Sequence, residues 1–184
     1  SLFGNKLEKI YILVGSGRNG KSLLVETLEK KALGSYSYTA ENTFLTSQFR
    51  QGAPNPTLYD CRGRRNLIVS EPAENDEFQR QTKINKEFVK QVSGNDSVTT
   101  RTLRESNITY KPQFTLFLLA NVTPTVDLDK AMMKRLVVIP CRNTYSDTPN
   151  NTPGSKQIDY SLKDLFNRED YACQYLHLLF ETYL

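Results

Sequence analysis

Hydrophobic positions along the chain form short continuous runs, separated by longer segments in which apolar residues recur at helical spacing. The short runs are rich in Val, Ile and Leu, which is typical of strands buried on both faces of a parallel sheet. They predict four strands, at Lys9–Val14, Arg65–Ser70, Phe114–Ala120 and Leu136–Pro140. The run 114–120 is apolar at almost every position, so we expect it to be central and to lie beside the first strand.

The helical spacing predicts helices at Lys21–Ala32 and Gln81–Val92, and a helical tail over Asp159–Leu184. Gly34 is expected to end the first helix. Apolar strands that alternate with helices indicate an α/β fold with a mostly parallel sheet flanked by helices. The length of 184 residues fits one domain covering 1–184, in which the polar stretch 143–155 is expected to be an exposed loop.

A different pattern lies between the second and third apolar runs. Ser97–Leu103 alternates polar and β-branched residues, a short polar turn follows, and Ile108–Gln113 continues, which predicts an inserted β-hairpin. Arg104, and after it Arg101 and Lys111, could neutralise the phosphates of a nucleic acid without recognising its sequence. The alternative is a charged edge hairpin whose cations prevent aggregation.

Composition and charge limit which partners, metal sites and cellular compartments are expected. The net charge of +4 permits a polyanionic partner but does not require one. Three scattered cysteines and a single histidine argue against a disulfide framework and a zinc site, and suit a reducing intracellular compartment. The apolar runs are too short to span a bilayer, so no membrane partner is expected. Because the chain begins with Ser1, we expect it to be a domain excised from a longer protein.

The strongest chemical signal is a glycine-rich segment between the first strand and the first helix. It matches the Walker A pattern, in which backbone N–H groups and a helix N-terminus surround the phosphates of ATP. Lys21 would neutralise the β- and γ-phosphates and Ser22 would bind Mg²⁺. The alternative is a strand-to-helix turn with a chance lysine. The segment comprises Gly15, Ser16, Gly17, Arg18, Asn19, Gly20, Lys21 and Ser22.

Two polar residues follow predicted strands at the edge where the glycine-rich segment is expected. Glu71 follows the strand 65–70, where a carboxylate could hold Mg²⁺, partly through water, or orient an attacking water. Asn121 follows the strand 114–120 and could position water by hydrogen bonds. The alternatives are a solvated loop acid and a residue that opens the turn towards Pro124.

Together these elements resemble the superfamily 3 helicases, an AAA+-type group, and most closely the poxvirus-type primase–helicases of nucleocytoplasmic large DNA viruses and related phages. The resemblance covers roughly Ile10 to Cys141. Beyond the Walker A and B segments it rests on a Gly-Asp-containing segment after a helix, the hairpin, an apolar strand ending in Asn, and a basic pair before the last strand. These are the segments 88–96, 97–113, 118–121 and 134–140.

The resemblance implies a role for each site residue. Glu71 corresponds to the Walker B acid and Asn121 to the sensor of the γ-phosphate. Arg135 corresponds to an arginine finger that enters the ATP site of a neighbouring subunit, and Lys90 to another basic residue at that shared site. Many relatives have two adjacent acids at the Walker B position, whereas here Glu71 stands between Ser70 and Pro72. Either one carboxylate has both roles, or Ser70 assists with Mg²⁺.

The implied protein is an ATP-driven DNA helicase of viral replication. Its homo-oligomeric ring, usually a hexamer, would grip single-stranded DNA with the hairpins and move 3′ to 5′. An upstream primase domain in the same chain, and action in the host cytoplasm or at a viral replication site, belong to the same expectation. Two other functions fit the Walker A segment, a small-molecule or nucleotide kinase and a nucleotide-gated assembly module that is not an enzyme.

Overall fold

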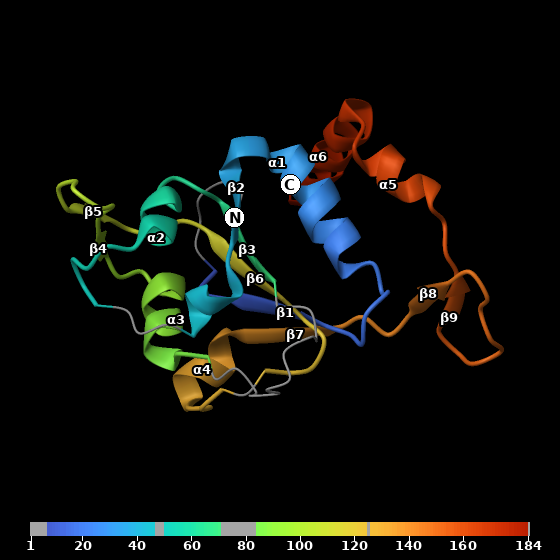
Figure 1. The fold of residues 1–184 in the computed structure, drawn as a ribbon, viewed down its shortest axis with the longest axis horizontal. Coiled ribbons are helices and arrows are strands. Elements are labelled where there is room, and N and C mark those ends of the chain that lie inside the picture. Colours follow the sequence, from blue (N-terminus) through green and yellow to red (C-terminus); the bar gives the residue numbers. More distant parts are fainter. Residues whose placement is uncertain (1–6, 47–49, 71–83, 125, 184) are drawn as a thin grey trace.

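The computed structural model describes residues 7–46, 50–70, 84–124 and 126–183. At its centre is a five-stranded sheet with the strand order β2-β3-β6-β1-β7 (Figure 1). Every neighbouring pair in this sheet is parallel. The strands are β1 (Ile10–Val14), β2 (Ser37–Ala40), β3 (Asn66–Ser70), β6 (Thr115–Ala120) and β7 (Leu136–Pro140).

The register confirms the predicted central strand. β6 lies between β3 and β1, with Ala120 opposite Val14 and Leu119 opposite Ser70. All four predicted strands are present, each within one residue of its expected bounds. β2 was not predicted, because Ser37–Ala40 contains neither an apolar run nor β-branched alternation. The α/β prediction is confirmed, with the sheet flanked by helices.

The helix after β1 begins near Lys21 and continues as a wider π-helical segment, η1 (Leu23–Glu29), and then α1 (Lys30–Leu33). Gly34 follows with φ of 53°, a left-handed conformation that ends the helix, as predicted. The C-terminal tail is helical but divided into α5 (Ser161–Phe166) and α6 (Glu169–Tyr183). No helix in the described ranges has the length and apolar composition that crossing a membrane requires.

The helix predicted at 81–92 begins later than expected. Residues 81–83 lie outside the described ranges, and α3 spans Lys86–Ser93. Asn85 caps it, since the side-chain oxygen of Asn85 accepts a hydrogen bond from the Phe88 amide at 3.1 Å. Four short helical segments of the described residues were not predicted, η2 (Gly34–Tyr36), η3 (Asn42–Leu45), α2 (Pro56–Asp60) and α4 (Lys130–Arg135).

The core lies on both faces of the sheet, as the continuous apolar strands require. On one face Ile12 joins a large cluster with α2, α3 and α4, in which Leu58, Leu67 and Met132 have no exposed surface. On the other face Leu13 joins Val25 from η1, with Ile68 and Leu119. The helix that follows the glycine-rich segment is therefore packed directly against the sheet.

The predicted hairpin is present with shorter strands than expected. β4 (Val98–Thr100) and β5 (Ile108–Tyr110) pair antiparallel, and residues 101–107 form the turn. The root of the hairpin is tied to the segment 50–58. The Gly52 amide donates to the Thr99 carbonyl at 2.9 Å, and the Thr100 hydroxyl donates to the Asn55 carbonyl at 3.1 Å. These contacts join the root of the hairpin to the segment that leads into α2.

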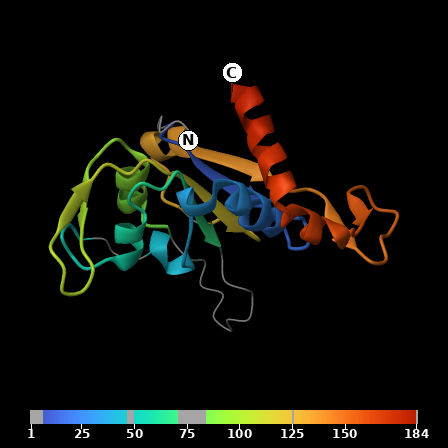
Figure 2. The ribbon, with the colours of Figure 1, turned by 90° about the horizontal axis from the view of Figure 1, so that it is seen from above.

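The stretch 143–155 differs from the expected loop. Its residues are mostly exposed, but it contains the strand β8 (Thr144–Ser146), which pairs in parallel with β9 (Ser155–Gln157). Three ladder positions in polar sequence left no hydrophobic pattern from which a strand could be predicted. Seen from above, the hairpin and the β8–β9 pair lie at opposite ends of the molecule (Figure 2).

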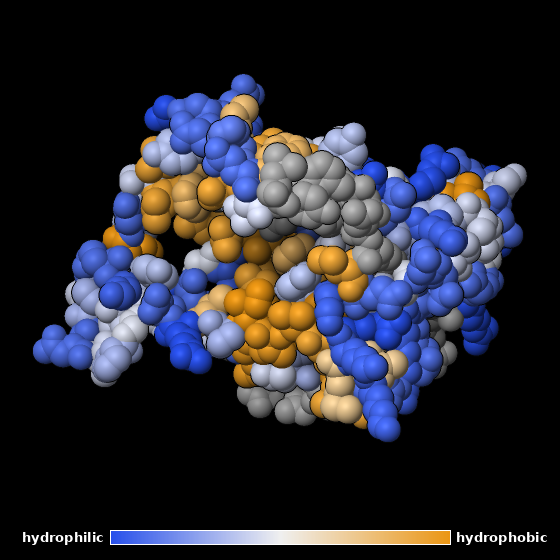
Figure 3. All heavy atoms as spheres, turned by 180° about the vertical axis from the view of Figure 1, so that it is seen from behind, coloured by the Kyte–Doolittle hydropathy of each residue, from blue (hydrophilic) through white to orange (hydrophobic). Residues whose placement is uncertain are grey.

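The strand β7 is at one edge of the sheet and is less covered than the others. Val138 is 48% exposed and Ile139 is 41% exposed. Met133, in the helix just before β7, is 56% exposed. From behind, hydrophobic side chains gather over the middle of the molecule (Figure 3).

The buried face of β3 gives the first prediction. Leu67 has no exposed surface, so Leu67→Ala should leave a cavity and destabilise the domain by about 2–5 kcal/mol in urea unfolding. Leu103→Ala is the matched control, because Leu103 is 74% exposed in the hairpin turn and should change the free energy of unfolding by less than about 0.5 kcal/mol. Equal effects of the two substitutions would contradict the assigned core.

Candidate functional site

The glycine-rich segment forms a tight loop at the C-terminal end of β1. Gly17, Arg18 and Gly20 have φ of 96°, 47° and 76°, and such left-handed backbone is easiest for glycine. The Gly15 amide continues the sheet by donating to the Ala120 carbonyl at 3.1 Å, and the Gly17 amide turns back to the Gly15 carbonyl at 2.8 Å. The loop is therefore anchored to the sheet where it begins and curls immediately afterwards.

The ammonium group of Lys21 lies inside this loop. Its Nζ donates to the Gly15 carbonyl and to Asn19 Oδ1, both at 2.6 Å, and Lys21 is only 8% exposed. A nearly buried cation is stable only where oxygen atoms surround it. The loop thus holds a positive charge among its own oxygens, a place where the oxygens of an anion could replace them.

The segment after β7 forms one wall of the loop. A Cβ at Gly15 would lie 2.8 Å from the Cys141 carbonyl oxygen, so only glycine fits there without a shift. Asn19 Nδ2 donates to the same carbonyl at 3.4 Å, and the Tyr145 amide of β8 donates to the Arg18 carbonyl at 2.8 Å. The β8–β9 pair is therefore joined to the loop through its backbone.

Two predicted polar positions follow β6, which is next to β1, and β3, which is next to β6. Asn121 comes directly after Ala120, which is level with Val14 at the start of the loop, and Asn121 is half-buried. Glu71 lies outside the described residues; in the sequence it follows Ser70, the last residue of β3. Within the described ranges, no group of three or more His, Cys, Asp and Glu side chains could hold a metal ion.

Glu26 is a polar residue of this edge that the sequence analysis missed. The Ser70 hydroxyl donates a hydrogen bond to Glu26 Oε1, which joins the end of β3 to the helix after the loop. Glu26 lies four positions after Ser22, about one helical turn, and this spacing was the available signal. The carboxylate fixes the direction of the Ser70 hydroxyl hydrogen.

Arg135 lies at the opposite end of the strands from the glycine-rich loop. The next residue, Leu136, is level with Ile10 at the start of β1, whereas the loop follows the end of β1. At about 3.3 Å per residue, Arg135 and the loop are separated by about 20 Å along the strands, more than an arginine side chain can reach. The guanidinium instead contacts Glu8 Oε2 at 3.3 Å and donates to the Ala131 carbonyl at 3.2 Å.

Lys90 lies beside α4. Its Nζ is 2.5 Å from Asp129 Oδ2 and 3.5 Å from Glu87 Oε1. The hydrogen bond from Lys90 lowers the pKa of Asp129 to about 2, and the same bond raises the pKa of Lys90. Both groups are therefore charged throughout the physiological range.

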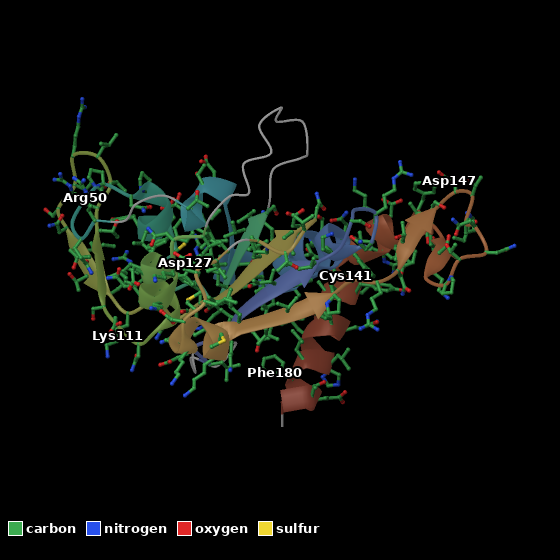
Figure 4. All side chains as sticks on the ribbon, turned by 90° about the horizontal axis from the view of Figure 1, so that it is seen from below. Arg50, Lys111, Asp127, Cys141, Asp147 and Phe180 are labelled. Carbon is green, nitrogen blue, oxygen red and sulfur yellow. The ribbon has the colours of Figure 1, made fainter. Side chains whose placement is uncertain are left out.

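The three predicted phosphate-binding cations share the hairpin. Arg101 and Arg104 lie in its turn and Lys111 follows β5, and all three are exposed. Arg104 has a φ of 68°. Lys111 is at the hairpin end of the molecule and Asp147 is at the opposite end. Cys141, which follows β7, lies between them (Figure 4). The structure brings these cations together, far from the glycine-rich loop of the same chain.

Two viral relatives match the sequence. A protein of Acanthamoeba polyphaga mimivirus, named as a putative helicase, is 39% identical over 138 residues, which are 74% of this chain and 14% of that protein. A protein of the Sputnik virophage, also named as a putative helicase, is 26% identical over 182 residues, 97% of this chain and 23% of that protein. The chain thus spans less than a quarter of either relative. No family model matches it.

Solved structures confirm the fold. Apo structures of the C-terminal region of NrS-1 superpose with TM-scores of 0.61 to 0.64 at 18–19% sequence identity. They match 92–93% of this chain, which corresponds to 35–37% of theirs. At this identity the likeness concerns the arrangement of strands and helices.

The pair of Lys90 and Asp129 predicts a defined pH dependence. Because the pKa of Asp129 is about 2 when folded and 3.8 ordinarily, the pair stabilises the folded state above about pH 4 and loses this effect as the pH falls towards 2. Asp129→Asn removes the charge but keeps a capping oxygen.

Urea unfolding between about pH 2.5 and 7 would test this prediction. The difference in unfolding free energy between the native chain and Asp129→Asn should be constant above about pH 5 and should shrink below about pH 4. A difference that stays the same or grows in acid would contradict the assigned ion pair.

Proposed function

We propose that this chain is the ATPase domain of a viral DNA helicase of the superfamily 3 type, which hydrolyses MgATP to move along single-stranded DNA. The observation that carries the proposal is the set of residues that gather at the C-terminal ends of the parallel strands. There a glycine-rich loop encloses Lys21, Asn121 follows the neighbouring strand β6, and β3, beyond β6, ends in Ser70, which precedes Glu71 in the sequence. The helicase names of the two viral relatives support it.

ATP and Mg²⁺ fit the residues of this edge. The backbone N–H groups of Gly15–Ser22 would surround the phosphates, and Lys21 would exchange its contacts with Gly15 and Asn19 for phosphate oxygens. Ser22 and Glu71 would bind Mg²⁺, which supplies charge neutralisation when bound, and Asn121 would orient water. Glu26 would orient the Ser70 hydroxyl, since it already accepts a hydrogen bond from it.

Arg135 would act on the nucleotide of a neighbouring subunit. Since the sheet separates Arg135 from the loop of its own chain, its guanidinium could stabilise phosphoryl charge only in another copy. A ring, expected to be a hexamer, satisfies this geometry for every subunit. The exposed hairpin cations lie at the same end of the strands as Arg135 and would grip single-stranded DNA. The proposal also includes an upstream primase domain in the same protein.

Mixing two inactive variants would test the shared site. Lys21→Ala should abolish ATP binding, and Arg135→Ala should lower kcat by about 10³-fold or more while ATP still binds. In mixed rings Lys21→Ala subunits supply Arg135 to intact loops, so ATP hydrolysis should reappear on mixing.

The control for this experiment is the double variant Lys21→Ala, Arg135→Ala, which should restore nothing when mixed with Arg135→Ala. Recovery with the double variant, or none with the single variants, would contradict a site shared between subunits. The activity per molecule of the native chain should also rise with protein concentration.

The hairpin gives a prediction about DNA. Arg104→Ala should weaken binding of single-stranded DNA and reduce the slope of log affinity against log salt by about 0.7, the value for one contact to a single strand. Arg168→Ala is the matched control, because Arg168 pairs with Asp170 at the distant α5–α6 junction. Fluorescence anisotropy with a labelled oligonucleotide would measure both. Equal losses would contradict a specific role of the hairpin.

A further inference from the structure

The helix that carries Arg135 is too short to hold its own position. α4 spans six residues, and a helix of that length is not stable without external contacts. Its start is fixed by Asp129. Oδ1 of Asp129 accepts the Met132 amide at 2.9 Å, and Oδ2 of Asp129 binds Lys90 Nζ at 2.5 Å. One carboxylate therefore caps α4 and connects it to α3.

The far end of α4 also meets α3. A Cβ at Gly94, which follows α3, would lie 3.8 Å from Arg135 Nη2, so the guanidinium is close to the end of that helix. The same guanidinium contacts Glu8 at 3.3 Å, and Arg135 Nε is buried without a hydrogen-bond partner among the described residues. Arg135 is thus held between its own helix, the segment before β1 and the C-terminus of α3.

Lys90 connects both of these contacts to the hairpin. Its carbonyl accepts the Gly94 amide at 2.8 Å and so closes α3, while its side chain holds the start of α4. Four residues after Gly94 the chain enters β4 at Val98. A displacement of the hairpin root would therefore reach α4 through Lys90 and through Gly94.

We propose that Lys90 and Asp129 are a positioning pair, which locks α4 to α3 so that movement of the DNA-gripping hairpin sets the position of Arg135. The proposal rests on the proposed function of Arg135 and the hairpin. It assigns Lys90 a role different from direct contact with nucleotide: Lys90 acts through Asp129 and α4. The pair is permanent rather than pH-switched, because both groups keep their charge at neutral pH.

Steady-state ATPase assays with and without single-stranded DNA would test the pair, using Lys90→Met, Asp129→Asn and their double variant. Each should lower the DNA-stimulated kcat by about 3- to 30-fold. Affinity for an ATP analogue should be unchanged, and the DNA-independent rate should fall much less than the DNA-stimulated rate. The double variant should be no worse than either single variant, since both remove one interaction. Lys90→Arg, which keeps the charge, should restore most of the stimulation.

Three results would overturn the proposal. Weaker binding of the ATP analogue by Lys90→Met would place Lys90 at the nucleotide. Equal loss of the basal and DNA-stimulated rates would show a merely structural pair, because a lower stability alone is expected from the loss of the ion pair. Additive losses in the double variant would show two independent residues.

A second measurement keeps the positioning pair testable if the native chain hydrolyses no ATP, a result that would refute the proposed function. Hydrogen exchange of Lys90→Met should then show faster exchange in both α4 and residues 94–98, with the sheet unchanged. Unchanged exchange in α4 would overturn the pair by itself.

Discussion

The parallel direction of all five strands is the constraint on which the rest of the structure depends. Because each strand enters at one edge and leaves at the other, residues that follow strands gather at one pole and residues that precede them gather at the opposite pole. The glycine-rich loop, Ser70 and Asn121 belong to the first pole, and Arg135 belongs to the second. No side chain spans this distance, so chemistry that needs both poles requires two copies of the chain.

The sequence was informative where hydrophobic burial determines structure. The apolar runs predicted four strands and the central place of 114–120, because a strand buried on both faces is built mostly from apolar residues. The hydrophobic pattern did not predict β2 or the β8–β9 pair. These strands are short and polar, and they are stabilised by neighbouring strands that no local pattern reveals. The late start of α3 at Lys86 was readable only from Asn85, a capping residue inside an otherwise helical pattern.

The candidate site was predictable in its backbone and less so in its partners. Spacing alone identified Gly15–Ser22, since a loop that turns this tightly restricts which residues fit. Glu26 was missed because most acidic residues on helices are simply solvated. Only the folded structure shows that its carboxylate accepts a hydrogen bond from Ser70. Lys90 was assigned through a family likeness, whereas the contact with Asp129 depends on how two distant helices pack.

The exposed edge of β7 has a practical consequence for handling the chain. Among the described residues no strand pairs with the outer side of β7, next to Val138 and Ile139, and the strand has no proline before Pro140 and no charge to discourage pairing. When the chain is purified at high concentration, β7 of one molecule could pair with a strand of another through backbone hydrogen bonds. Light scattering would therefore be needed to separate colloidal clusters from defined assemblies, and a lysine introduced at Val138 could improve solubility.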